Sequence, residues 1–163
     1  MFAYKIVMVG DFGVGKTSLV RRFVDNSFSE EYLSSIGVSI SKKTLTNSMV
    51  MLWDIEGKTE SKPIYESYLN GAKGFIVVAD ITRAATIEGI SEHIELCMRK
   101  SPHAPIVVSL NKNDIQTDSV YDKDKIENLS PNIIMVVETS AKSGESVEDI
   151  FLNLDSKIVE QIK

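Results

Sequence analysis

Cysteine, histidine and long apolar runs are scarce in this sequence, and each scarcity excludes a class of protein. One cysteine, Cys97, stands among 163 residues, so the chain can form no internal disulfide and no cysteine-based metal cluster. The two histidines, His93 and His103, lie in or beside a helical pattern, and we expect them to be exposed or to cap a helix rather than to bind metal. No segment stays apolar over the roughly eighteen residues that a membrane-spanning helix needs. These absences favour a protein of a reducing compartment.

Targeting signals are missing from both ends of this sequence as well. Met1–Lys5 runs straight into a strand pattern, without the basic flank and apolar block of a secretory signal. Gln161–Lys163 contains no cysteine that could carry a prenyl group. We expect a cytoplasmic protein without a transmembrane segment, which would reach a membrane only through partner proteins or through a tail that this sequence does not include.

Charge of one sign is not concentrated anywhere in the chain. The sequence has 18 basic and 23 acidic residues, a net charge of −5, and no block of like charge that would suggest a tail or a nucleic-acid patch. We therefore expect no nucleic-acid partner. With 163 residues and 43% hydrophobic content, the chain is long enough for one buried core and too short for two ordinary domains. Residues 1–163 are expected to form a single domain.

Strand and helix patterns alternate along the chain. Strand signals recur at Tyr4–Val9, Val38–Leu45, Ser48–Asp54, Gly74–Asp80, Ile106–Leu110 and Ile133–Glu138. Helical patterns lie at Lys16–Asp25, Pro63–Asn70, Thr86–Lys100, Lys123–Asn128 and Ser146–Ile162, the last with Ser146 as its expected cap. The alternation and the continuous apolar strands predict an α/β fold with a mostly parallel sheet and helices on both faces. Thr46-Asn47 predicts a tight hairpin turn between two antiparallel strands.

A glycine-rich motif directly follows the first strand. Residues 10–17 (GDFGVGKT) fit the pattern G-x-x-x-x-G-K-S/T of a loop that wraps a polyphosphate. Glycine lets backbone N–H groups turn inward, Lys16 would neutralise the terminal phosphates, and the Thr17 hydroxyl would bind a bridging Mg²⁺. A plain glycine-rich turn is the alternative, but the strand before it and the helix after it favour the phosphate loop. The residues expected to contact the nucleotide here are Asp11, Phe12, Gly13, Val14, Gly15, Lys16, Thr17 and Ser18.

The loops after two later strands are expected to select the purine base, which distinguishes GTPases from kinases and ATPases. Asn111-Lys112-Asn113-Asp114 fits N-K-x-D, and Asp114 can accept from both the N1–H and the amine of guanine. The stem of Lys112 can cover one face of the base. Ser140-Ala141-Lys142 supplies a second loop, whose Ala141 N–H could reach the guanine carbonyl. By itself the first motif could be a capped turn, but three such loops at three strand ends favour a nucleotide site.

On these motifs the whole chain resembles a Ras-superfamily small GTPase, and the stretch from Tyr32 to Val38 is most similar to the Rab branch. The resemblance implies a P-loop NTPase fold, with a six-stranded sheet containing one antiparallel strand and with five helices. It also implies GTP or GDP with Mg²⁺ as ligands. Two mobile segments, Tyr32–Gly37 and Asp54–Glu60, would sense the terminal phosphate. Effector and exchange-factor proteins would contact Tyr32–Gly37 and Asp54–Tyr68.

Further site residues are implied by the same resemblance. Phe28 matches the aromatic residue that packs edgewise on the base, and Tyr32 matches the ring that closes over the phosphates. Ser35 matches a magnesium-binding threonine, although it lacks the β-branch that stiffens that side chain. Asp54 matches the carboxylate that holds Mg²⁺ through water, and Gly57 the glycine whose N–H meets the terminal phosphate. The implied metal site consists of Thr17, Ser35 and Asp54.

The sequence departs from the family pattern at the hydrolytic site, which would comprise Lys58, Gly57 and Lys16. Lys58 stands where the family carries a glutamine that positions the attacking water. A protonated lysine has three donors and no acceptor, so it cannot orient that water in the same way, although its charge could act as an arginine finger does. Glu56 replaces an alanine and would repel the phosphates, and Phe12 replaces a small residue beside the terminal phosphate. Alternatively, these three side chains all face solvent and change little.

Two functions are compatible with these features. The first is a guanine-nucleotide switch whose intrinsic GTP hydrolysis is slow. The second is a GTP-bound interaction module that scarcely hydrolyses its nucleotide. GDP that copurifies with the protein would favour the first, and copurifying GTP the second. An ATP-dependent small-molecule kinase lacks support, because Asn111–Asp114 is predicted to select guanine.

Overall fold

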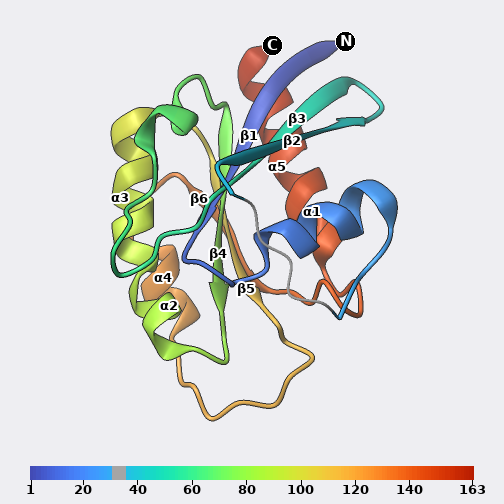
Figure 1. Ribbon diagram of the computed structural model, residues 1–163. Coiled ribbons are helices and arrows are strands. Elements are labelled where there is room, and N and C mark those ends of the chain that lie inside the picture. Colours follow the sequence, from blue (N-terminus) through green and yellow to red (C-terminus); the bar gives the residue numbers. More distant parts are fainter. Residues whose placement is uncertain (31–35) are drawn as a thin grey trace.

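A six-stranded sheet forms the centre of the molecule, with helices on both of its faces (Figure 1). The computed structural model describes residues 1–30 and 36–163. The strands are β1 (Phe2–Gly10), β2 (Val38–Thr44), β3 (Ser48–Ile55), β4 (Gly74–Asp80), β5 (Ile106–Asn111) and β6 (Ile133–Glu138). The helices are α1 (Lys16–Asp25), α2 (Ala84–Glu88), α3 (Ile90–Lys100), α4 (Lys123–Glu127) and α5 (Val147–Ile162), with a 3₁₀ turn, η1 (Glu66–Leu69).

The strand order places the ends of the parallel strands along one edge of the sheet. The order is β2-β3-β1-β4-β5-β6, and neighbouring strands are parallel except for β2 and β3. In the predicted hairpin turn between those two, the N–H of Leu45 donates to Ser48 O at 2.8 Å. The predicted α/β fold with one antiparallel strand is confirmed. The loops that follow the five parallel strands all begin at the same edge of the sheet.

Helices bury the sheet from both sides. Every residue of β4 and of β5 is buried, which explains why their sequences are apolar without alternation. Helices α1 and α5 cover one face, where the rings of Phe23 and Phe151 stack with their centroids 4.2 Å apart. Helices α2, α3 and α4 lie on the opposite face (Figure 1). In residues 1–30 and 36–163, no helix is both long enough and apolar enough to cross a membrane.

Three of the helix predictions need correction. The Pro63–Asn70 pattern yields only η1, because a single turn fixes many dihedral angles for few hydrogen bonds. The helix predicted over Thr86–Lys100 begins earlier, at Ala84, and divides into α2 and α3 at Gly89, a residue that weakens helices. Ser146 precedes α5, but its φ of 56° is left-handed and its side chain makes no capping hydrogen bond. A capping serine normally has an extended backbone.

Two leucines of α5 provide a matched test of the core. Leu154 is fully buried, whereas Leu152 is 41% exposed. We expect Leu154→Ala to lower the free energy of unfolding by about 2–5 kcal/mol, through lost apolar burial and the cavity left behind. Leu152→Ala should change it by less than about 0.5 kcal/mol. Urea unfolding followed by circular dichroism measures both values, and equal losses would contradict the assigned faces of this helix.

Candidate nucleotide-binding site

The phosphate loop joins β1 to α1 at the carboxyl edge of the sheet. Gly13 and Gly15 have φ angles of 81° and 103°, a left-handed backbone that other L-residues rarely adopt. A Cβ atom at Gly15 would also lie only 2.3 Å from Asn111 Nδ2. Glycine is therefore required at this position. The loop leads directly into α1 at Lys16, so the N-terminus of that helix lies at the site.

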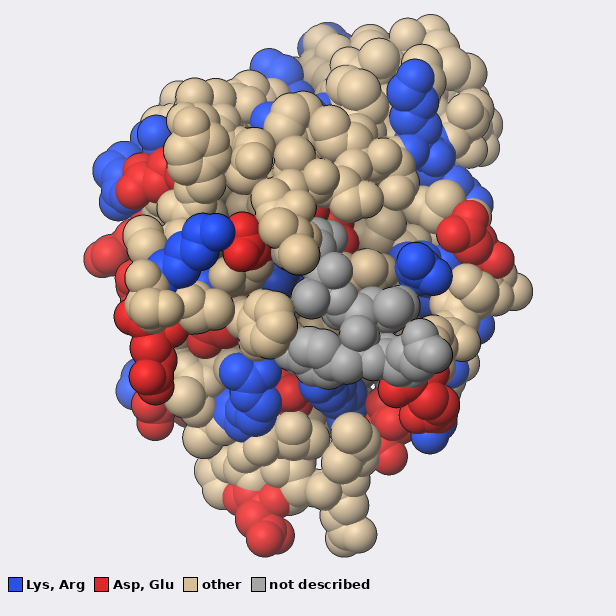
Figure 2. All heavy atoms as spheres, viewed as in Figure 1, with Lys and Arg blue, Asp and Glu red and all other residues tan. Residues whose placement is uncertain are grey.

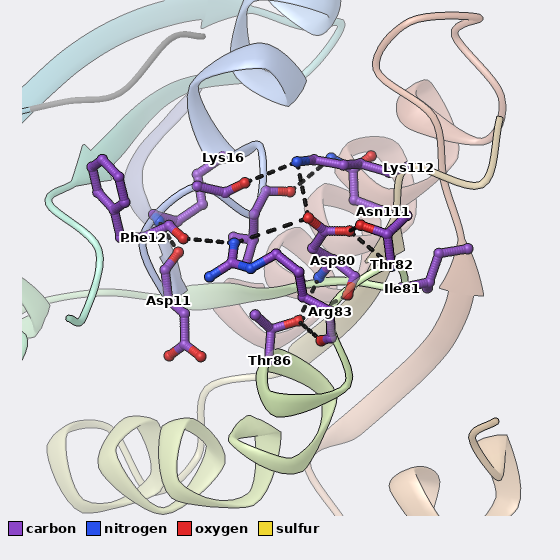
Figure 3. A network of polar contacts seen from close by, with 12 residues as sticks. Asp11, Phe12, Lys16, Asp80, Ile81, Thr82, Arg83, Thr86, Asn111 and Lys112 are labelled. Atoms are coloured by element: carbon purple, nitrogen blue, oxygen red, sulfur yellow. Dashed lines mark hydrogen bonds and ion pairs between the residues drawn. The ribbon is translucent and has the colours of Figure 1, made fainter. Parts of the chain in front are cut away.

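The carbonyl groups of this loop are engaged by side chains. Four successive carbonyl oxygens accept hydrogen bonds, and three of the four donors come from the last residue of β5 and from the loops after β4 and β5 (Figure 3). The pairs are Lys16 Nζ to Asp11 O at 3.2 Å, Arg83 Nη1 to Phe12 O at 2.9 Å, Lys112 Nζ to Gly13 O at 3.0 Å and Asn111 Nδ2 to Val14 O at 2.9 Å. Because N–H and C=O point in opposite directions across a trans peptide, these contacts fix the directions of the N–H groups that follow.

Two of the predicted metal ligands are neighbours. Thr17 Oγ1 donates to Asp54 Oδ2 at 2.5 Å, so a hydroxyl at the start of α1 meets a carboxylate near the end of β3. Asp54 is 3% exposed. Hard oxygen donors of this kind fit Mg²⁺. The third predicted ligand, Ser35, lies outside the described residues, as does Tyr32, which was predicted to close over the phosphates.

Lys16 is a buried cation beside this oxygen pair. Burial lowers the pKa of its ammonium group to about 8, while the negative charges of Asp54 and Asp11 act in the opposite direction. The residue is 6% exposed. An anion placed next to it would therefore stabilise its charged form. The electrostatics of the loop favour a ligand with several negative charges.

A pocket of about 250 Å³ adjoins the loop and collects the predicted base-binding residues. Asp114 Oδ1 accepts from Ser140 Oγ at 2.7 Å, which joins the two loops that were predicted to read the base. Lys142 Nζ and Glu30 Oε1, both from the lining, form an ion pair at 3.1 Å. The predicted site residues that line this pocket are Gly13, Gly15, Ser18, Phe28, Asn111, Lys112, Asp114, Ala141 and Lys142.

The segment after β3 is attached to the phosphate loop through its backbone. The N–H of Phe12 donates to Lys58 O at 2.8 Å, and the N–H of Lys58 donates to Gly10 O at 3.1 Å. A Cβ atom on Gly57 would lie 2.6 Å from Phe12 N, so only glycine allows this approach. Phe12 itself is 39% exposed. The backbone of Gly57, predicted to meet the terminal phosphate, thus lies directly against the loop.

The charged side chains that depart from the family pattern are held by ion pairs. Lys58 Nζ lies 2.6 Å from Glu92 Oε2 on α3, and this hydrogen bond raises the pKa of Lys58. The Glu56 carboxylate pairs with Lys62 Nζ at 3.0 Å and accepts from the N–H of Gly37 at 3.3 Å. Those two hydrogen bonds, chiefly the one from Lys62, lower the pKa of Glu56. Lys58 and Glu56 are therefore paired at the surface rather than unpaired in solvent, and the alternative that they change little stays a prediction.

The sequence did not indicate that a buried histidine, His93, lies against the phosphate loop. His93 is 2% exposed and its Nε2 lies 2.8 Å from Asp11 Oδ1, so the expectation of an exposed or capping histidine is wrong. The fold brings the first turn of α3 against the phosphate loop, a contact that has no local sequence signal. Burial tends to raise the pKa of Asp11, but the contact with His93, together with the charges of Lys58 and Arg83, outweighs it and holds that pKa below its usual range.

A buried carboxylate at the end of β4 was missed as well. Asp80 Oδ2 lies 2.9 Å from Lys112 Nζ and 3.9 Å from Arg83 Nη1, and its side chain is 1% exposed (Figure 3). Asp80 Oδ1 accepts from the N–H and the hydroxyl of Thr82 at 2.9 and 2.6 Å. An acidic residue at the end of an otherwise apolar strand was the only sequence signal for it. The carboxylate contacts two of the cations that bind loop carbonyls.

A comparison with protein families agrees with this geometry. The model of the Ras family matches residues 5–160. The chain belongs to the Ras family. It is therefore a small GTPase of the GTP-binding switch type, and its six-stranded sheet has the arrangement of the P-loop NTPases. Guanine nucleotides, Mg²⁺, regulators and effectors are the ligands and partners of this family in general.

Asp114→Asn tests the predicted base selector. An amide can donate where a carboxylate only accepts, and xanthine presents a carbonyl where guanine has its amine. We expect the variant to lose on the order of 100-fold in GTP affinity and to prefer xanthosine triphosphate, as measured by competitive fluorescence titration. Asp118→Asn, which changes an exposed acid in the same loop, should leave selectivity unchanged. An unaltered preference in the Asp114 variant would remove that residue from its assigned role.

Proposed function

We propose that this protein is a guanine-nucleotide switch whose intrinsic hydrolysis of GTP is slow. The observation that carries the proposal is the pocket shared by the phosphate loop and the loops after β5 and β6. In it, Asp114 and the N–H of Ala141 would read guanine, and Phe28 and the stem of Lys112 would pack against the base. The inward N–H groups of the loop and the buried ammonium of Lys16 would bind the phosphates.

A magnesium ion would complete the phosphate site. Thr17, Ser35 and Asp54 are the proposed ligands, with Asp54 acting through water. The hydrogen bond of 2.5 Å between Thr17 Oγ1 and Asp54 Oδ2 supports the first and last of these, because it places the two oxygens side by side. When bound, the ion would neutralise charge on the terminal phosphates. The N–H of Gly57 is proposed to contact the same phosphate group.

The contacts of Lys58 support slow hydrolysis. Its ammonium group forms an ion pair with Glu92 of α3 at 2.6 Å and is directed to that helix rather than to the phosphate loop. Even when released from that carboxylate, it offers no acceptor that could orient an attacking water. The proposed hydrolytic residues Lys58, Gly57 and Lys16 would therefore stabilise negative charge without aligning the nucleophile. Positioning of the nucleophile contributes a large part of the rate in this reaction class.

The contacts of Glu56 favour a second candidate, a GTP-bound interaction module that scarcely hydrolyses its nucleotide. This carboxylate joins the N–H of Gly37, before β2, to the side chain of Lys62, after β3. The N–H of Glu56 also donates to Gly37 O at 2.7 Å. Contacts within the protein thus connect the segment before β2 to the segment after β3. In a nucleotide switch, the terminal phosphate of GTP would order these same two segments. GTP rather than GDP in the purified protein would support this candidate.

Exposed apolar residues in and beside the segments before β2 and after β3 support a protein-binding surface. Ile36 is 92% exposed, Tyr65 63% and Ile40 49%. We propose that effectors and exchange factors bind here, over Tyr32–Gly37 and Asp54–Tyr68, as in the Rab branch. Basic and acidic side chains are interspersed on the face shown in Figure 2, without a broad basic area that would support binding of nucleic acid.

Equilibrium titration with GDP, GTP and ADP tests the proposed ligand. In the presence of Mg²⁺ we expect both guanine nucleotides to bind on the order of 10³-fold more tightly than ADP, because adenine leaves the Asp114 carboxylate without its two donors. Removal of Mg²⁺ with a chelator should speed nucleotide release. Equal affinity for ADP and GDP, or binding of neither, would overturn the proposed function.

Lys58→Gln tests the proposed cause of slow hydrolysis. Glutamine can donate to the phosphate and accept from water, so we expect single-turnover GTP hydrolysis to rise by about tenfold or more. Lys58→Met is the matched control, since it also breaks the ion pair with Glu92 but adds no acceptor, and its rate should stay low. If Lys58→Met hydrolyses GTP as fast as Lys58→Gln, the lysine itself inhibits hydrolysis, and the missing acceptor is not the cause.

A further inference from the structure

Of the four side chains that donate to the loop carbonyls within residues 1–30 and 36–163, Arg83 lies outside the sequence motifs. Lys16, Asn111 and Lys112 all belong to the two predicted nucleotide motifs, whereas Arg83 lies between β4 and α2. Its Nη1 atom donates to Phe12 O at 2.9 Å (Figure 3). A charged donor to a carbonyl forms a stronger hydrogen bond than a neutral one. The contact therefore restrains the part of the loop that would lie nearest the terminal phosphates.

The backbone of Arg83 is fixed on both sides. Its N–H donates to Asp80 O at 3.0 Å, and its carbonyl accepts from the hydroxyl of Thr86 at 2.8 Å. The guanidinium also lies 3.9 Å from the buried carboxylate of Asp80. These contacts limit the positions that the guanidinium can take. The side chain is 47% exposed, so it could be replaced without opening a cavity in the core.

Asp80 connects two cations that bind two successive peptide groups of the loop. Arg83 binds the carbonyl of Phe12 and Lys112 binds that of Gly13, and both cations contact Asp80 Oδ2. In the peptide between Phe12 and Gly13, the N–H of Gly13 points away from the guanidinium. Hydrogen bonding at the carbonyl also polarises that amide and makes its N–H a better donor.

From this geometry we infer that Arg83 is a positioning residue, which orients the N–H of Gly13 toward the β- and γ-phosphates of a bound nucleotide. The inference rests on the proposed function. Phe12 is held on its other side by Lys58 O, which accepts from its N–H at 2.8 Å. Residue 12 is thus bound through its N–H to the segment after β3 and through its carbonyl to the loop after β4. Loss of Arg83 removes the hydrogen bond to the carbonyl of the Phe12–Gly13 peptide.

Arg83→Met tests this role, since methionine retains much of the apolar stem and removes every donor. We expect the Kd for GDP to rise about tenfold, the value of one charge-assisted hydrogen bond, and the Kd for GMP to change less than about twofold. In phosphorus NMR, the β-phosphate resonance of bound GDP should move while the α-phosphate resonance stays in place. Arg83→Lys, which keeps a charged donor, should recover most of the lost affinity.

Arg99→Met is the matched control for removing an arginine. Arg99 lies on α3, its side chain is 60% exposed, and it pairs with Glu66 at 3.2 Å, away from the phosphate loop. The Arg99→Met variant should bind GDP and GMP with the same affinities as the wild type. The melting temperatures of the nucleotide-free variants show whether either substitution acts through folding.

The outcomes separate this inference from the proposed function. If the wild type binds GDP and Arg83→Met binds it with the same Kd, the positioning role is overturned and the proposed function stands. Equal losses of GDP and GMP affinity would also overturn it, since they would mean that Arg83 acts on the base loop through Asp80 and Lys112. A wild type that binds no guanine nucleotide would remove the proposed function, and this role with it.

Discussion

The direction of the peptide groups in residues 10–15 is the constraint on which the whole site depends. A loop that turns its N–H groups toward a ligand must turn its carbonyl groups the other way, where they need partners of their own. A buried polar group without a partner costs about 1–3 kcal/mol. Arg83 after β4, Asn111 at the end of β5 and Lys112 after it meet this requirement. The order of the strands therefore matters to function, because β4 and β5 must end beside the loop.

Buried charges at the same edge are arranged so that each one positions another group. Asp80 is almost completely enclosed; Thr82 donates two hydrogen bonds to its Oδ1, and the ammonium of Lys112 lies 2.9 Å from its Oδ2. Lys112 in turn binds the loop, so the cost of burying a carboxylate is offset by contacts that fix the site. Asp54 and Thr17 stand in a similar relation on the other side of β1.

How far the sequence could predict this arrangement depends on whether a contact has a local signature. The apolar strands, the hairpin at Thr46-Asn47 and the pocket that gathers Asp114 with Ala141 were all predicted, since each follows from a short pattern and from parallel topology. Contacts such as His93 with Asp11 join residues 82 positions apart. No spacing rule connects them, because they arise from how α3 packs on the sheet. Glu92 with Lys58 is a contact of the same kind.

The ion pair between Lys58 and Glu92 helps to separate an electrostatic from a geometric cause of the slow hydrolysis that we propose. The Lys58 side chain is 34% exposed and that of Glu92 63%, and pairs of this exposure contribute little to stability because water and salt screen them. A triphosphate carries more negative charge than one carboxylate, so it could compete for this ammonium. Release of Lys58 would then supply positive charge but still no acceptor for water. The slow hydrolysis that we propose would thus follow from the chemistry of the lysine itself, and the contact with α3 would only add to it.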